Sequence, residues 1–258
     1  MSYVQTATVL SQSASEVLGG VYPTSVQPSY ASRFDNALEN LAEGNFPSVP
    51  FLSLAPVAAD EVVTLGRSLS SPVALQTAAL QSADMTLIFV ARLPNAPGSG
   101  NGNLGVMGAT FYNSTSLNGW NGLAFGIGQG SALLYLCNDV NGSLSTQYEG
   151  AAITDAQAQA WGLYVARISS SGGNGITATV RALSAGTEKT QSWSGSIYSK
   201  SGETPTVMLG ADYLSIFGTS QAIQLKRGFI WNAALSDTDI AAMTALIRTD
   251  LAADGVIV

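Results

Sequence analysis

The chain has 258 residues and a formal net charge of −7, with only 10% charged and 46% hydrophobic residues. It contains no histidine, which excludes Ser-His and Cys-His nucleophile pairs and the common zinc sites. Binding to a phosphate backbone needs clustered lysine and arginine, so the acidic balance argues against DNA or RNA as a partner.

Cys137 is the single cysteine, and we interpret it as a small buried apolar residue that forms no disulfide within the chain. A chain of this length can bury a core large enough to fold without a disulfide or a metal. No apolar run approaches the roughly 20 residues of a membrane helix, so we expect no membrane insertion. Met1–Leu10 is short and polar, which predicts that the chain has no secretion signal.

Residues 1–60 differ in pattern from the rest of the chain, and we predict that they form an arm. Val4–Leu10 fits a strand that adds to a neighbouring sheet, and Ser32–Leu41 fits a short helix. Three prolines between residues 47 and 56 then indicate an extended linker. Because the arm has too few apolar residues for its own core, it should pack on its own sandwich or on a partner subunit.

From Val62 onward, short apolar and β-branched segments alternate with turn-forming residues. Met85–Leu93 has the strongest strand pattern, and Asn141-Gly142 is the clearest hairpin turn. The predicted strands are 62–65, 85–93, 104–111, 122–127, 132–137, 143–148, 161–168, 176–183, 188–193 and 207–209, with a helical turn or loop over 151–160. Strands at this spacing are typical of a two-sheet sandwich.

The last part of the chain predicts a strand that leads into an amphipathic helix. Apolar residues alternate at Ile223, Leu225, Phe229 and Trp231, as in a half-buried strand with one apolar face. Ser236 has the place of a helix N-cap. The apolar residues that follow at helical spacing are Ile240, Met243, Leu246, Ile247 and Leu251.

The run Gly-Phe-Ile-Trp-Asn-Ala-Ala-Leu-Ser-Asp-Thr-Asp-Ile, ending at Ile240, resembles the last strand and exit helix of laminin-G-like domains. Those domains have the concanavalin A-like jelly-roll fold. Segments Met85–Leu93, Trp161–Ile168, Ile176–Arg181 and Val207–Gly210 follow the order of that family.

The resemblance covers about residues 60 to 258. It implies an all-β, two-sheet antiparallel jelly-roll sandwich over 61–258, preceded by an arm over 1–60 with a short helix and closed by a C-terminal amphipathic helix. Lectins, adhesion modules, glycanases and viral fibre domains all use this fold, so the fold leaves the function open.

The acidic residues argue against an enzyme. Glycanases of this fold carry a Glu-x-Asp-x-x-Glu run, which the sequence lacks. The nearest acidic pairs are Asp60-Glu61 in a linker and Asp237/Asp239 at a helix start, where negative charge is favourable. We expect both pairs to be structural.

Aromatic residues in or beside the predicted loops are the candidate sugar-binding residues. Tyr112, Trp120, Trp193 and Tyr213 offer rings on which a sugar can stack, and Asn121 offers hydrogen bonds. The alternative is that these rings cap the ends of the sandwich or fill a subunit interface.

Asp139 and Asp212 are the candidate ligands of a calcium ion, the one cofactor for which the sequence has a pattern. Asp139-Val-Asn-Gly-Ser143 has the spacing that opens an oxygen-ligand loop, but Gly150 stands where an EF-hand needs glutamate. Some laminin-G-like domains bind calcium at a sheet rim through an aspartate and backbone carbonyls, and that resemblance points to Asp139 or Asp212. The alternative at Asp139 is a plain hairpin turn.

Two functions fit these observations. The first is a non-enzymatic structural protein of a phage virion, such as a fibre, spike or decoration protein. A durable, small-residue, β-rich chain without a secretion signal suits a protein that leaves its host by lysis. Residues 1–60 would then join other virion proteins and further copies of the chain, with a homotrimer expected. The alternative is a carbohydrate-binding module for glycans on a host cell surface.

Overall fold

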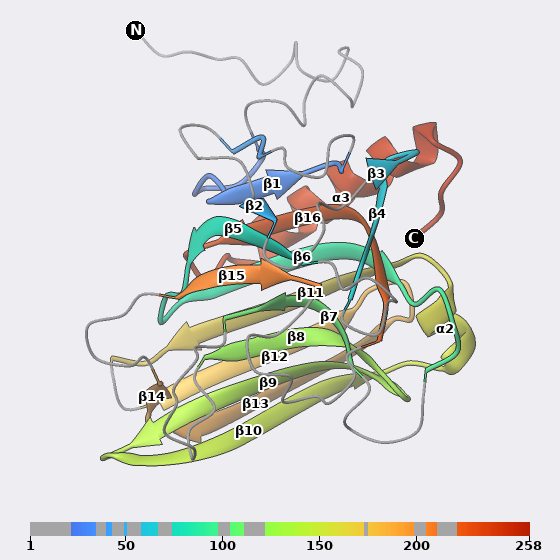
Figure 1. Ribbon diagram of the computed structural model, residues 1–258. Coiled ribbons are helices and arrows are strands. Elements are labelled where there is room, and N and C mark those ends of the chain that lie inside the picture. The colour runs from blue at the N-terminus through green and yellow to red at the C-terminus, as the bar shows by residue number, and fades with distance from the viewer. Residues whose placement is uncertain are drawn as a thin grey trace, which may run out of the picture.

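The computed structural model describes residues 22–34, 40–42, 49–50, 58–66, 74–97, 104–110, 122–172, 175–198, 205–210 and 221–258. Two antiparallel sheets face each other, and helix α3 (Asp237–Ala253) lies on the outside of one of them (Figure 1). The predicted all-β sandwich and C-terminal helix are therefore confirmed. Among the described helices, none is long and apolar enough to cross a membrane.

Sheet A carries the helix and has the strand order β13-β12-β11-β6-β16-β4-β3, with β1 also paired to β16. Its strands are β1 (Tyr30–Ser32), β3 (Ala58–Ala59), β4 (Val62–Leu65), β6 (Met85–Arg92), β11 (Gly162–Ser170), β12 (Gly175–Ala182), β13 (Thr187–Ser194) and β16 (Ile223–Trp231).

Sheet B has the strand order β10-β9-β8-β7-β15-β5-β2, with β14 paired to β9. Its strands are β2 (Val49–Pro50), β5 (Leu75–Leu80), β7 (Gly105–Ala109), β8 (Leu123–Gly128), β9 (Ser131–Val140), β10 (Ser143–Ala152), β14 (Ser196–Ile197) and β15 (Thr206–Leu209). The short helix α2 (Asp155–Gln159) connects β10 to β11, within the region predicted as a helical turn or loop.

Strand β6 is apolar on both faces because both faces are covered. Leu87 and Phe89 point into the core between the sheets, where Phe89 meets Phe125 of β8 at a ring-centroid distance of 6.5 Å. Ile88 and Val90 point outward and are buried under α3. This double burial explains the continuous apolar run that makes β6 the clearest strand in the sequence.

Helix α3 begins where the sequence predicts. The Ser236 side chain caps the helix by accepting a hydrogen bond from the Asp239 backbone N–H at 3.1 Å. The buried helix residues pack on the outer face of sheet A against Phe229 and Trp231. They are Ile240, Met243, Ile247 and Leu251, with Leu246 partly buried beside them.

A β-bulge in β16 overturns the expectation that the strand has a single apolar face. Leu225 pairs with Ala91 and Arg227 pairs with its neighbour Val90, so Lys226 is an extra residue. The side-chain alternation therefore reverses at Lys226. Residues before the bulge, such as Leu225, face the core between the sheets, whereas Phe229 and Trp231 face α3. The bulge also carries Arg227 to the helix side, next to the acidic residues of α3.

The predicted helix Ser32–Leu41 is wrong at both ends. Ser32 belongs to β1 and pairs with Gly228 of β16, and residues 33–34 and 40–42 are not helical. Residues 35–39 lie outside the described part of the chain. Pairing with a strand near the other end of the chain overrides the local helical spacing, because it buries Tyr30 and Phe34 in the core between the sheets.

Residues 22–34 pack on the chain's own sandwich, which is one of the two arrangements that the sequence left open. The Tyr22 ring meets Phe229 edge-on at a centroid distance of 5.8 Å. The Trp231 indole N–H donates a hydrogen bond to the Val26 carbonyl at 3.0 Å. The predicted strand Val4–Leu10 lies outside the described residues, and the division of the chain at residue 60 stays a prediction.

Candidate functional site

Four side chains form a row across the outer face of sheet A. They are Thr64 on β4, Gln224 on β16, Arg92 on β6 and Trp161 directly before β11. Gln224 stands opposite Thr64 on one side and Arg92 on the other. The residues next to them on each strand point into the core between the sheets, so the row faces outward.

The row is held together by direct contacts. The Arg92 Nε–H donates a hydrogen bond to Gln224 Oε1 at 2.7 Å, and Gln224 Nε2 donates to Thr64 Oγ1 at 3.2 Å. The Arg92 guanidinium carbon lies 4.5 Å from the centroid of the Trp161 ring, a cation–π contact. The guanidinium is thus fixed by a hydrogen bond and by a ring before any ligand arrives.

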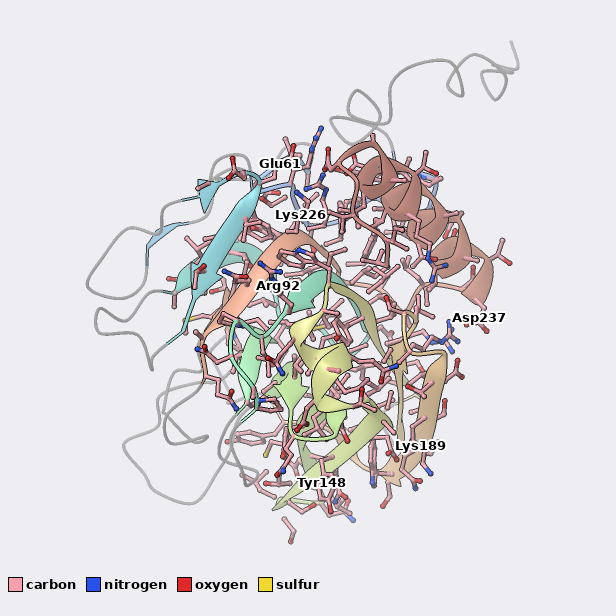
Figure 2. All side chains as sticks on the ribbon, turned by 90° about the vertical axis from the view of Figure 1, so that its right-hand side faces the viewer. Glu61, Arg92, Tyr148, Lys189, Lys226 and Asp237 are labelled. Carbon is pink, nitrogen blue, oxygen red and sulfur yellow. The ribbon has the colours of Figure 1, made fainter. Side chains whose placement is uncertain are left out.

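This row is the floor of a groove of about 470 Å³, which we name the sheet A groove. Its rim is formed by Asp60 on the β3–β4 turn, Lys226 at the bulge and Val256 after α3. In Figure 2, Glu61, Lys226 and Arg92 lie near one another beside β4 and β16.

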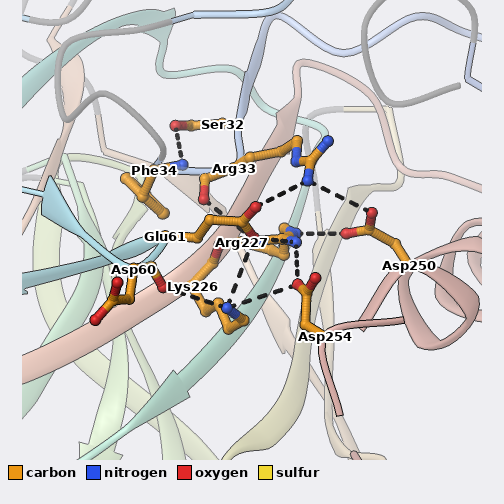
Figure 3. A network of polar contacts seen from close by, with 9 residues as sticks. All are labelled: Ser32, Arg33, Phe34, Asp60, Glu61, Lys226, Arg227, Asp250 and Asp254. Atoms are coloured by element: carbon orange, nitrogen blue, oxygen red, sulfur yellow. Dashed lines mark hydrogen bonds and ion pairs between the residues drawn. The ribbon is translucent and has the colours of Figure 1, made fainter. Parts of the chain in front are cut away.

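Arg227 lies behind the rim at the centre of a network of ion pairs (Figure 3). Its side chain is 0% exposed, and its Nε lies 2.7 Å from Asp250 Oδ2. Its Nη2 lies 3.0 Å from Asp254 Oδ2 and 2.6 Å from Glu61 Oε2. Arg227, directly after the bulge, therefore connects the β3–β4 turn to the end of α3.

Two more cations complete this network. Arg33 Nη2 lies 3.0 Å from Glu61 Oε1 and 3.9 Å from Asp250 Oδ1. Lys226 Nζ lies 3.6 Å from both Glu61 Oε2 and Asp254 Oδ2. We name these six residues the Arg227 network: Arg33, Lys226 and Arg227 with Glu61, Asp250 and Asp254. The ion pairs of the network hold the rim of the groove in place. Because its three positive and three negative groups balance, the network adds no net charge to the rim.

The network makes stability depend on acid pH through Glu61. Burial alone would raise the pKa of Glu61, but attraction to Arg227, with smaller contributions from Arg33 and Lys226, lowers it from 4.5 to about 2. The stabilisation is complete above pH 4.5 and should be lost as the pH falls toward 2, because the unfolded chain takes up the proton first. The free energy of unfolding, measured in denaturant between pH 7 and pH 2, should decrease as the pH is lowered from about 4.5 toward 2.

Glu61→Gln should flatten that part of the pH profile relative to the wild type. Glu149→Gln, which lies on β10 outside the network, is the control and should keep the wild-type slope. Parallel pH profiles for the wild type and Glu61→Gln would contradict the role given to Glu61.

Only one predicted sugar-binding residue, Trp193, lies in the described part of the chain. It is on β13, and its partly buried ring packs against the core between the sheets. That packing matches the alternative in which the ring fills an end of the sandwich. Tyr112, Trp120, Asn121 and Tyr213 lie outside the described residues, so this set stays a prediction.

Asp139 lies at the tip of the β9–β10 hairpin, and its carboxylate serves the turn. Asp139 Oδ1 accepts a hydrogen bond from the Gly142 backbone N–H at 2.6 Å. The turn residues Asn141 and Gly142 have φ values of 53° and 85°, as the predicted Asn-Gly hairpin requires. No group of three or more Asp, Glu or Cys residues suited to a metal occurs in the described residues, and Asp212 lies outside them. Calcium at Asp139 or Asp212 stays a prediction.

The hairpin tip also has a cavity of about 320 Å³, lined by Asp139, Asn141 and Ser194–Ser196. None of the described residues that line it is aromatic. Farther along β10, on the outer face of sheet B, Tyr148 is 65% exposed, and its ring centroid lies 5.9 Å from that of Tyr135. Figure 2 places Tyr148 at the opposite end of the molecule from Glu61. The sheet A groove is the better candidate, because it combines a ring with fixed polar groups in one concavity.

Three of the four residues in the acidic pairs have structural roles, as the sequence predicted, whereas Asp60 lines the sheet A groove. Glu61 belongs to the Arg227 network. Asp237 accepts hydrogen bonds from Arg181 at 2.6 Å and Arg167 at 2.8 Å, which lower its pKa and attach α3 to sheet A. Asp239 completes the cap of α3.

Cys137 is buried, as predicted, and carries a free thiol. Burial, together with the nearby charge of Asp139, raises the pKa of this thiol to about 11. The thiol is therefore protonated at neutral pH and is not a reactive nucleophile.

The sequence interpretation missed the sheet A groove. It placed Trp161 at the start of the predicted strand 161–168 and gave Arg92 no role. A signal was present: Arg92 is the one charged residue in the apolar run of β6, and Gln224 interrupts the apolar start of β16. Polar residues of this kind indicate where a covered face of a sheet becomes open.

The sequence matches no protein-family model and no curated protein. Solved structures do match. The binding domain of botulinum neurotoxin DC, in complex with rat synaptotagmin II, is similar with a TM-score of 0.52 and 12% identity, over 85% of this chain and 52% of that chain. The binding domain of botulinum neurotoxin serotype G gives a TM-score of 0.52 and 12% identity, over 85% of this chain and 50% of that chain.

The fold is a concanavalin A-like jelly roll. This chain spans about half the length of the two toxin domains. The exoplasmic/lumenal domain of VIP36, in its Ca²⁺/Man2-bound form, has a TM-score of 0.45 and 10% identity, over 81% of this chain and 89% of that chain. At 12% identity, the two toxin comparisons show a shared fold alone.

Proposed function

We propose that this chain is a non-enzymatic carbohydrate-binding module and that the sheet A groove holds its sugar. The observation that carries the proposal is the row of hydroxyl, amide, guanidinium and indole groups along the floor of the groove. A sugar ring has apolar C–H faces and a rim of hydroxyls, which suit an aromatic surface beside fixed donors and acceptors. The volume of about 470 Å³ lies in the roughly 300–1,000 Å³ range of small-ligand sites.

Binding fits the described residues better than catalysis does. The chain has no histidine, and three of the four residues in the acidic pairs, Glu61, Asp237 and Asp239, serve ion pairs and a helix cap. The two similar toxin structures are binding domains as well, which agrees with a binding role. The acidic residue on the rim, Asp60, has no second described carboxylate beside it in the lining of the groove.

Replacing Trp161 with alanine should weaken glycan binding about tenfold or more, because it removes the ring and releases Arg92. The measurement is a glycan array followed by calorimetry with the best oligosaccharide. Since Trp161 also packs partly against the cluster under α3, Trp161→Phe is the milder variant and denaturant unfolding checks the fold.

Tyr148→Ala is the matched control, since it removes an exposed ring on β10, an outer strand of sheet B, and should leave binding unchanged. Loss of binding in Tyr148→Ala alone would move the site to the outer face of sheet B. An array on which the wild-type chain binds no glycan would remove the proposed function.

Display on a phage virion is a separate proposal that comes from the sequence. A sugar-binding sandwich joined through residues 1–60 to other virion proteins, in a homotrimer, would give the particle a means of attaching to a host surface glycan. The two proposals are compatible, and the binding measurements on groove variants test the carbohydrate-binding proposal alone.

A further inference from the structure

Arg92 differs from the other described arginines in its partners. Arg33, Arg167, Arg181 and Arg227 form ion pairs with carboxylates, and Arg248 donates to the Val258 carbonyl. Arg92 is held instead by a neutral amide and an indole ring. No described carboxylate lies within ion-pair distance of it. In a chain with a net charge of −7, an arginine in a groove without an acidic partner needs an explanation.

We infer that the sheet A groove selects glycans that carry a carboxylate, and that Arg92 binds that carboxylate. This inference rests on the proposed function and names the class of sugar, namely one with a uronic acid or a similar acidic residue.

The geometry of Arg92 supports a planar anion as the ligand. Nε is occupied by Gln224 and one face of the guanidinium lies over Trp161, whereas Nη1 and Nη2 donate to no described residue. These two nitrogens form a fork that matches the two oxygens of a carboxylate. Charge-assisted hydrogen bonds are about twice as strong as bonds between two neutral groups, and a two-pronged Arg–carboxylate pair adds both energy and geometric specificity. The side chain is already ordered, so little conformational entropy is lost on binding.

The charges around the groove leave Arg92 available. Lys226 on the rim is balanced by Glu61 and Asp254 and adds no net charge. Among the described residues, Asp60 on the exposed turn is the one acidic residue that lines the groove. The negative charges elsewhere on the surface act weakly on Arg92, because physiological salt screens interactions between exposed charges that are more than roughly 8 Å apart. Arg92 therefore gives the floor of the groove its preference for a negatively charged ligand.

Matched glycans test the inference directly. The probes are oligogalacturonides and sialylated oligosaccharides, each compared with its methyl ester, in which the same carboxylate carries no charge. Sulfated glycans form a third arm. The wild-type chain should bind at least one acid at least tenfold more tightly than its ester. Arg92→Gln should weaken that binding roughly 10- to 100-fold and remove the preference.

Lys189→Gln is the control, since it removes one positive charge from β13, away from the groove, and should change neither affinity nor preference. Equal binding of acids and esters would overturn the inference and leave the proposed function standing. Binding of sulfated glycans without binding of carboxylates would also overturn it. Binding of no glycan of any kind would remove both.

Discussion

Replacing Arg227 with methionine is expected to lower the free energy of unfolding by about 3–5 kcal/mol, the range for breaking a buried ion pair. Arg227 is 0% exposed and its main partner, Asp250, is 3% exposed. Without the guanidinium, the Asp250 carboxylate stays buried with only Arg33 in reach, at 3.9 Å. Methionine keeps the apolar volume but supplies no donor. Denaturant unfolding at pH 7 measures the loss.

Two comparisons separate the buried charge from other effects. The double variant Arg227→Met/Asp250→Leu removes both charges and should lose less stability than Arg227→Met alone, because no unpaired carboxylate is left in the interior. Asp237→Asn breaks ion pairs on the surface, where Asp237 is 69% exposed, and should cost about 1 kcal/mol or less. A loss in Arg227→Met as small as that of Asp237→Asn would show that the network contributes little.

The strands that could be predicted from the sequence are buried on both faces or are joined by a turn that needs particular residues. Strand β6 was predicted as Met85–Leu93 and is observed as Met85–Arg92. The β9–β10 hairpin follows from Asn141-Gly142, whose positive φ values few other residue pairs adopt at low cost. Ser236 predicted the start of α3, because a helix cap depends only on residues close in sequence.

Long-range pairing accounts for what the sequence did not predict. Strand β1 has three residues, and only its ladder with β16 makes it a strand. Strand β5 alternates through Leu75, Thr77 and Ala79, a weak apolar pattern that pairing with β15 stabilises. The bulge at Lys226 has no local signal, since the residues around it still alternate. Each feature depends on a partner far away in the chain.

The sheet A groove escaped prediction for the same reason. Thr64, Arg92, Trp161 and Gln224 come from four separate segments, and each reads alone as an ordinary strand residue. Only the order β11-β6-β16-β4 brings them side by side. The sequence therefore supplied the fold, whereas the topology was needed to find the site. The sequence pattern pointed to the loops, where aromatic residues are conspicuous, whereas the groove lies on an uncovered part of a sheet.

A chain that starts at residue 35 is expected to lose at least about 5 kcal/mol of stability relative to a chain that starts at residue 22. The difference lies in residues 22–34, which bury Tyr22, Tyr30 and Phe34. Removing one large buried aromatic side chain costs about 3–5 kcal/mol. A domain has only about 5–15 kcal/mol in total, so the shorter chain should be partly or wholly unfolded. Denaturant unfolding and near-ultraviolet circular dichroism of the two chains make the comparison.

Point variants in the complete chain show whether packing is the cause. Tyr30→Ala should cost about 3–5 kcal/mol, whereas Val26→Ala, at a side chain that is 47% exposed on the same segment, should cost well under about 1 kcal/mol. The hydrogen bond from Trp231 to the Val26 carbonyl survives that control. If the chain from residue 35 were as stable as the chain from residue 22, residues 22–34 would be part of a detachable arm. The expected loss would instead place the junction between arm and sandwich before residue 22, because β1 is a strand of sheet A.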